Sequence, residues 1–187
     1  PTAEFNEKFN KDKEIIGQFV SQPIGYNRNP LKTRDAYFGP SAFVDLIHTL
    51  QLSLSGAEIS MAAPLSYDAT IDEGEIKMSD MFNLYKYENM LYVMNLSGKE
   101  IKDYLEMSYD LWISTIKTPE DHLLRLTENS NGILKFENPT FNFDSAAGII
   151  YTVDATKEKG QRISISSMSD GTSFDPERIY RVAINSY

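Results

Sequence analysis

Two short clusters in this sequence combine aromatic rings with a hydrogen-bonding amide or carboxylate. Residues 85–89 read YKYEN, and residues 141–144 read FNFD. A flat heteroaromatic ligand needs two apolar faces to enclose its ring and polar groups to bind its edge. Each cluster offers both kinds of group, which makes it a candidate binding segment. Aromatic rings of this kind more often pack in the core, so the residues alone favour a structural role for both clusters.

The other residues that could perform chemistry are few. The chain of 187 residues has no cysteine and two histidines, His48 and His122. Neither histidine lies at metal-ligand spacing from another histidine or an acidic residue, and the sequence has no nucleophile elbow and no glycine-rich phosphate loop. We therefore expect no catalytic residue and no metal site in this chain. His48 is expected at the surface or in a groove of a helix, and His122 in a polar loop.

The charge balance limits the partners of the chain. Its formal net charge is −9, from 27 acidic and 18 basic side chains. Such a chain is repelled by polymeric nucleic acid and by anionic membranes, although a single nucleotide in a local pocket remains compatible. The sequence contains no apolar run of 18 residues, so we expect no membrane span.

The elements that must position the two clusters follow from apolar spacing and turn residues. Residues 1–14 indicate the start of an amphipathic helix or a frayed end, and the apolar run 14–25 predicts a strand. Further strands are predicted over 59–64, 89–96, 149–153, 162–167 and 178–187, and helices over 41–50, 77–82 and 97–112. Ser97 and Glu100 have the spacing of a capping box. This mixed order predicts an α+β fold with more than one sheet layer.

The segment 56–106 resembles the core of the 5′-nucleotidase C-terminal domain. Its matching positions are Gly74, Ile76, Asp80, Tyr87, Asn89, Leu91, Ser97, Gly98, Ile101, Leu105 and Glu106, and a later set is Gly148, Tyr151, Asp154, Gly160, Arg162 and Ile163. The motifs are collinear over about residues 20–187. A finer similarity, through AAP at 62–64 and both aromatic clusters, is to the 2′,3′-cyclic-nucleotide 2′-phosphodiesterase/3′-nucleotidase branch.

The resemblance implies a layered α/β/β/α architecture, with a polar segment or helix over residues 1–19 and a substrate-binding domain over residues 20–187. It implies that this domain binds the base and ribose of a nucleotide or nucleoside. Hydrolysis, with two divalent metals, then belongs to a separate metallophosphatase domain, in the same chain or another one. The family also implies a periplasmic or exported protein. Because the chain opens at Pro1 and its last strand reaches Tyr187, we expect the native chain to be longer.

The resemblance also implies roles for individual residues. Tyr87 matches the first of two rings that enclose the base, and Phe141 is the best match for the second, with Phe143 as the alternative. Asn89 matches the residue that hydrogen-bonds the base, and Asp144 the residue that contacts the ribose.

One departure from the family concerns the phosphate. Many 5′-nucleotidases have an arginine after the first buried strand, but residues 62–68 of this chain read AAPLSYD and contain none. Arg34 is then the candidate for the phosphate contact. The alternative function is a stand-alone, non-catalytic module that binds a nucleoside or another small ligand.

Overall fold

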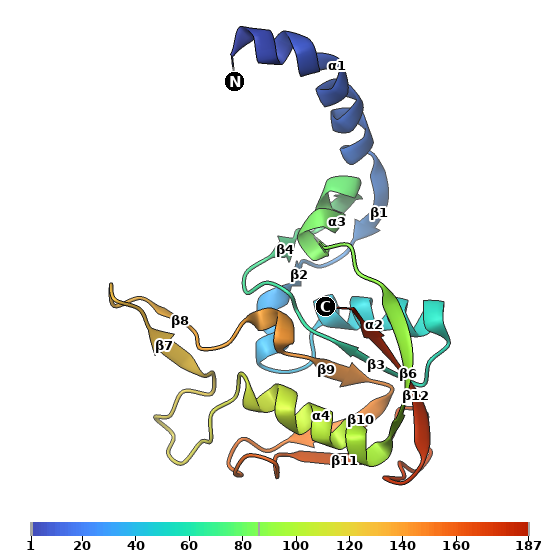
Figure 1. Cartoon of the computed structure of the whole chain (residues 1–187), viewed down its shortest axis with the longest axis vertical. Coiled ribbons are helices and arrows are strands. Elements are labelled where there is room, and N and C mark those ends of the chain that lie inside the picture. The colour runs from blue at the N-terminus through green and yellow to red at the C-terminus, as the bar shows by residue number, and fades with distance from the viewer. Residues whose placement is uncertain (1, 86, 187) are drawn as a thin grey trace. The chain divides into compact units, whose positions relative to one another are not determined.

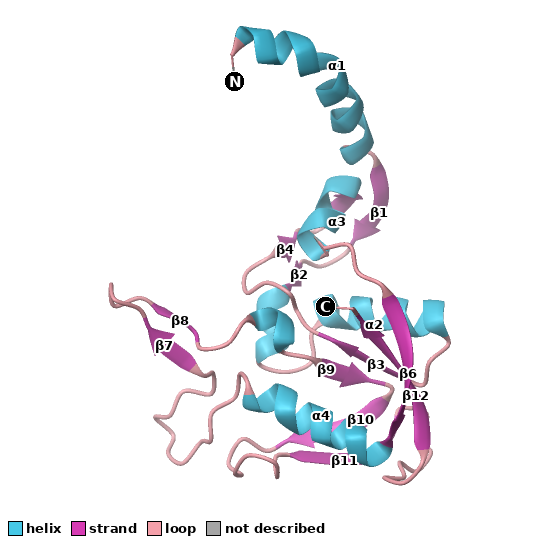
Figure 2. Ribbon diagram, viewed as in Figure 1, coloured by secondary structure: helices cyan, strands magenta, loops and turns pink. Residues whose placement is uncertain are grey.

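The computed structural model of the protein describes residues 2–85 and 87–186, with helices and strands in mixed order (Figures 1 and 2). The chain divides into two compact units. The smaller unit consists of residues 1–32 and 68–88, and the larger unit of residues 33–67 and 89–187. The chain leaves the larger unit after Tyr67 and re-enters it at Asn89.

The smaller unit consists of two helices and two short antiparallel strand pairs. Its elements are α1 (Ala3–Val20), β1 (Pro23–Asn27), β2 (Leu31–Lys32), β4 (Thr70–Ile71), β5 (Gly74–Lys77) and α3 (Met78–Leu84). β1 pairs with β5, and β2 pairs with β4. The predicted short helix at 77–82 is confirmed as α3. No helix within residues 2–85 and 87–186 is long and apolar enough to cross a bilayer.

The predicted strand over residues 14–25 is wrong in its first part. Residues 14–20 continue α1, and Ser21 ends the helix by donating its backbone N–H to the carbonyl of Gly17 at 3.1 Å. An apolar run of this length fits a strand or a helix segment equally well by pattern. The strand begins only at Pro23, which has no N–H to continue the helical hydrogen bonds.

The larger unit is built on a four-stranded mixed sheet in the order β6-β12-β3-β9. Its strands are β6 (Leu91–Ser97), β12 (Ile179–Asn185), β3 (Ile59–Ala62) and β9 (Ser145–Ala147). β12 runs parallel to β3 and antiparallel to β6, and β9 runs antiparallel to β3. The remaining elements are η1 (Thr33–Tyr37), α2 (Ala42–Ser55), α4 (Gly98–Asp110), β7 (Leu126–Glu128), β8 (Leu134–Phe136), η2 (Thr140–Asn142), β10 (Ile149–Val153) and β11 (Ile163–Met168).

The two faces of this sheet carry different layers (Figure 1). In β3, Ile59 and Met61 join the hydrophobic core that includes Ile101 and Leu105 of α4, whereas Ser60 contacts α2. This alternation follows from the period of two in a strand. The core of the larger unit therefore lies between the sheet and α4. The predicted capping box is confirmed: Ser97 and Glu100 each bind the backbone N–H of the other at the start of α4.

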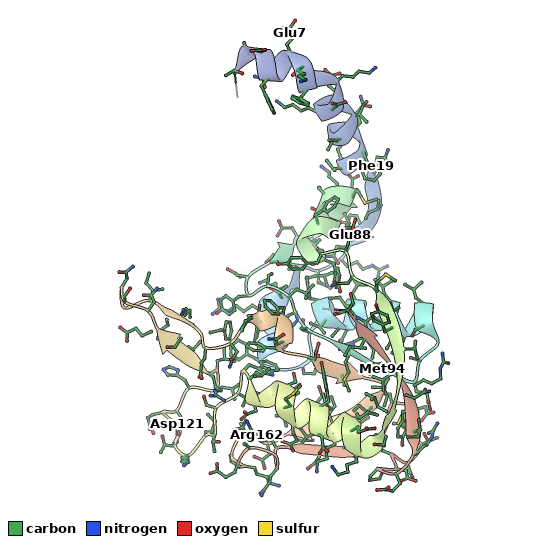
Figure 3. The ribbon with its side chains drawn as sticks, in the orientation of Figure 1. Glu7, Phe19, Glu88, Met94, Asp121 and Arg162 are labelled. Carbon is green, nitrogen blue, oxygen red and sulfur yellow. The ribbon has the colours of Figure 1, made fainter. Side chains whose placement is uncertain are left out.

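The start of β11 is joined to α4 by a buried ion pair. Arg162 is 3% exposed, and its guanidinium lies 3.5 Å from Asp110 and donates to the carbonyl of Ile113 at 3.1 Å. Figure 3 shows Arg162 beside the C-terminal end of α4. A buried guanidinium needs such partners, so this residue of the family pattern supports the fold.

His48 is a buried residue, which corrects the expectation of a surface or groove position. It is 3% exposed, and its Nδ1 lies 2.9 Å from the Ser60 hydroxyl, which donates to Gln51 Oε1. Because that hydroxyl gives its hydrogen to Gln51, Nδ1 must carry the ring proton. Nε2 lies 3.3 Å from the Ser145 hydroxyl. Burial lowers the pKa of His48 to about 4, so the ring joins α2 to β3 and β9 in its neutral form.

Candidate functional site

The two phenylalanines of the FNFD cluster occupy different environments. Phe143 is 1% exposed, and its ring stacks on Trp112 with 5.4 Å between centroids and an interplanar angle of 11°. Phe141 is half-buried within η2, the single 3₁₀ turn that precedes Phe143. The structure therefore places Phe143 in the core. Phe141 is the ring of this cluster that keeps surface toward solvent.

Asp144 ties the same segment to α4. Its carboxylate accepts a hydrogen bond from the Tyr104 hydroxyl, and its backbone carbonyl accepts one from the Ser108 hydroxyl at 2.8 Å. Burial raises the pKa of Asp144 to about 6, although the hydrogen bond from Tyr104 acts in the opposite direction. Asp144 therefore fixes the path of the chain just beyond Phe141 through its contacts with α4.

Tyr87 and Asn89 lie on either side of the point where the chain passes from the smaller to the larger unit. Tyr87 belongs to the smaller unit and is 38% exposed. Asn89 is half-buried and precedes β6 in the larger unit. Lys86, which lies inside this cluster, is outside the described residues. Phe141 belongs to the larger unit, so the two predicted base-binding rings come from different units.

Arg34 is exposed on η1 and carries its charge over an aromatic ring. Its guanidinium carbon lies 5.4 Å from the centroid of the Tyr67 ring. Within the described residues Arg34 forms no ion pair, whereas Arg125, Arg162 and Arg178 each pair with a carboxylate. A cation without an acidic partner is a suitable contact for an anionic ligand group.

Tyr67 is a candidate site residue that the sequence did not indicate. It is 38% exposed, follows the AAPLS segment directly, and contacts Arg34 from 33 positions away in the chain. The only local signal is an aromatic residue in a loop after Pro64. Nothing in the sequence links that residue to Arg34.

The described residues do not form a metal centre. They contain no group of three or more histidine, cysteine, aspartate or glutamate side chains that could hold a metal ion. Both ring nitrogens of His48 already lie at hydrogen-bonding distance from serine hydroxyls. The donor set of the residues that the structure describes therefore does not fit a binuclear metal site.

Two hollows of the larger unit lie away from the predicted residues. One, of about 650 Å³, is lined by polar and leucine side chains between residues 114 and 137, including Lys117, Asp121 and His122. The other, of about 380 Å³, is an apolar groove between the sheet and α4, lined in part by Met61, Met94 and Tyr104. None of the predicted site residues lines either hollow.

Comparison with known proteins places the chain in a family. Residues 16–187 match the family described as 5′-nucleotidase, C-terminal domain. The trifunctional nucleotide phosphoesterase protein YfkN of Bacillus subtilis is 28% identical over 205 residues, covering 100% of this chain and 12% of that protein. The 2′,3′-cyclic-nucleotide 2′-phosphodiesterase/3′-nucleotidase of Salmonella typhimurium is 22% identical over 210 residues, covering 94% of this chain and 31% of that protein.

Solved structures agree on the fold. A protein described as a 5′-nucleotidase from Staphylococcus aureus superposes with a TM-score of 0.75 at 23% identity, covering 100% of this chain and 35% of that one. The 5′-nucleotidase precursor of Thermus thermophilus gives a TM-score of 0.66 at 22% identity, covering 99% and 34%. The chain belongs to the 5′-nucleotidase C-terminal domain family, which confirms the predicted family and the α+β class. It spans a third or less of the length of the curated relatives above.

Proposed function

We propose that this chain is the domain that binds the base and ribose of a nucleotide in a 5′-nucleotidase or 2′,3′-cyclic-nucleotide phosphodiesterase. The observation that carries the proposal is the family match over residues 16–187, because it spans both aromatic clusters in collinear order. The names of the relatives that match, a nucleotide phosphoesterase and a cyclic-nucleotide phosphodiesterase, support a phosphate ester of a nucleoside as the ligand. An exported or periplasmic location is part of the same proposal.

Hydrolysis, in this proposal, takes place outside this chain. The relatives are several times longer than the matched segment, which leaves room for a further domain. The donor set described above does not fit a pair of divalent metals, so we place both metals in that separate metallophosphatase domain. The contribution of this chain is to bind and orient the nucleoside part of the substrate.

The residues that we assign to this task are the ones that the family resemblance indicates. We propose that Tyr87 and Phe141 each contact a face of the base, because each ring keeps exposed surface. Asn89 binds the edge of the base. Asp144 contacts the ribose with the carboxylate oxygen that Tyr104 does not hold, and Phe143 supports the segment from the core.

Tyr87→Ala and Phe141→Ala should each weaken the binding of adenosine and of adenosine monophosphate by about tenfold, because stacking contributes about 1–3 kcal/mol per base. Isothermal titration calorimetry with the purified chain measures both affinities. Tyr26→Ala and Phe38→Ala are the matched controls, since these rings are 71% and 58% exposed and lie in the smaller and the larger unit. Wild-type affinity in both test variants would exclude the stacking role.

A metal test addresses the division of labour. The purified chain should show no phosphatase activity with a nucleotide substrate when Mn²⁺ or Co²⁺ is added, because its described residues include no group of ligands that could hold a metal ion to activate water. Metal-dependent turnover by this chain alone would contradict the proposal and show a metal centre within it.

A further inference from the structure

The turn after β3 holds a strained residue. Leu65 has φ of +57°, and it is the one non-glycine residue with positive φ in the described part of the chain. The backbone N–H of Ser66 donates to the carbonyl of Pro64 at 2.6 Å, which closes a three-residue turn with Leu65 at its centre. Turns of this hand are rare and strained, and a bulky residue seldom occupies one. Such strain persists only where the surroundings fix it, and it concentrates at binding and catalytic sites.

Three hydrogen bonds fix this turn from two sides. Besides the bond to Pro64, the carbonyl of Leu65 accepts from the Thr140 hydroxyl at 3.3 Å, and the carbonyl of Ser66 accepts from the Tyr37 hydroxyl at 3.0 Å. Thr140 begins η2, which contains Phe141, and Tyr37 ends η1, which contains Arg34. The strained turn is therefore held by the same two segments that carry the predicted base and phosphate contacts.

The residue that leaves the turn is Tyr67, and its ring is supported on several sides. The centroid of the Tyr37 ring lies 5.6 Å away, and that of Phe136 lies 5.3 Å away at 71°. Tyr37 is 1% exposed, so it is a rigid support. Arg34 and Tyr37 lie three residues apart in a 3₁₀ helix, where side chains at that spacing align. Both therefore reach the same ring from one element, and the guanidinium of Arg34 lies over it.

We propose that Tyr67 is a positioning residue that holds Arg34 against the phosphate group of the bound nucleotide. The inference rests on the proposed function and deepens it. Arg34 has no acidic partner within the described residues, although the protein carries a net charge of −9. A guanidinium held over a ring loses less rotational freedom when it binds a phosphate, and guanidinium–phosphate hydrogen bonds are strong. Tyr67 and Arg34 together replace the arginine that residues 62–68 lack.

The test compares ligands with and without phosphate. Arg34→Gln should weaken adenosine monophosphate about tenfold or more and leave adenosine unchanged. Tyr67→Leu, which removes the ring under the guanidinium, should weaken the monophosphate about threefold to tenfold, again without effect on adenosine. Tyr67→Phe keeps the ring and should behave as wild type. Arg28→Gln removes the same charge from an exposed position in the smaller unit and serves as the matched control.

A double variant separates positioning from general damage. If Tyr67 acts through Arg34, Tyr67→Leu in the Arg34→Gln background should cause no further loss of monophosphate affinity. An equal loss for adenosine and its monophosphate in Tyr67→Leu would overturn the inference, because the ring would then serve the base or the fold. Unchanged monophosphate affinity in Arg34→Gln would also overturn it.

The outcome for adenosine keeps this inference distinct from the proposed function. If wild-type chain binds neither adenosine nor the monophosphate, the proposed function itself fails. If adenosine binds but Arg34→Gln does not weaken the binding of adenosine monophosphate, only the proposed role of Tyr67 and Arg34 fails. A melting temperature for each variant, with Tyr67→Phe as reference, identifies any variant that has lost its fold.

Discussion

Phe143→Ala should lower the free energy of unfolding by about 3–5 kcal/mol, the usual loss when a large buried aromatic ring is removed. The ring is 1% exposed and contacts three other rings of the core: Trp112 at 5.4 Å, Phe136 at 5.5 Å and Tyr37 at 6.1 Å between centroids. Removing it leaves a cavity in the middle of this aromatic cluster, which the neighbouring rings cannot fill without tilting.

Phe141→Ala, two positions away, provides the contrast. Its half-buried ring should contribute no more than about 1.5 kcal/mol to stability. Urea unfolding at pH 7, followed by the fluorescence of Trp112, measures both variants, since Trp112 is the single tryptophan of the chain and is 2% exposed. Equal losses, or a larger loss for Phe141→Ala, would contradict the assignment of Phe143 to the core and Phe141 to the surface.

The FNFD cluster shows where sequence reasoning stops. Two rings at a spacing of two residues would share one face of a strand, so the pattern alone gives no reason to separate Phe141 from Phe143. The 3₁₀ turn at Thr140–Asn142 separates them, and that turn is held by long-range contacts such as Thr140 to Leu65. The residue types located the cluster and the family resemblance implied its role, while tertiary contacts decided which of its rings is buried.

Elements with local signals were predicted well. The capping box of α4 and the strands β3, β6 and β12 of the main sheet depend on spacing within a few residues, and the structure has them, whereas β9 was not predicted. The apolar run 14–20 fits either a helix or a strand by its local pattern; a strand was predicted, and the structure has a helix. His48 and Tyr67 depend on partners far away in the chain, Ser145 and Arg34, and no local pattern predicts such pairs.

Two buried groups should make the stability of the protein respond to pH in opposite directions. The pKa of His48 is about 4 in the folded chain and about 6.5 when unfolded, so between these values only the unfolded chain binds the proton. This contribution raises the free energy of unfolding by about 3 kcal/mol as the pH rises from 4 to 6.5. The pKa of Asp144 is about 6 in the folded chain and about 3.9 when unfolded, so its contribution falls by about 3 kcal/mol as the pH rises from 4 to 6.

In the wild type these two contributions nearly cancel between pH 4 and 6. Relative to wild type, the free energy of unfolding of Asp144→Asn should therefore rise with pH. That of His48→Asn should fall with pH relative to wild type. The amide introduced by His48→Asn can still donate to the Ser60 hydroxyl in place of the ring, which limits other damage. The exposed carboxylates of Asp121, Asp154 and Asp170, whose pKa values are lowered chiefly by hydrogen bonds, act equally in all three proteins and drop out of the difference.

Urea unfolding at half-unit steps from pH 4.5 to 7 measures these differences. If the free energy of unfolding of Asp144→Asn changes with pH in parallel with that of wild type, Asp144 stays ionised in the fold. The hydrogen bond from Tyr104 then outweighs the effect of burial on its pKa. If the free energy of unfolding of His48→Asn changes with pH in parallel with that of wild type, the His48 ring can take up a proton while it joins α2 to the sheet. Either result would revise the pKa assigned to one of these two groups and leave that of the other unchanged, because the two side chains share no hydrogen bond in the described residues.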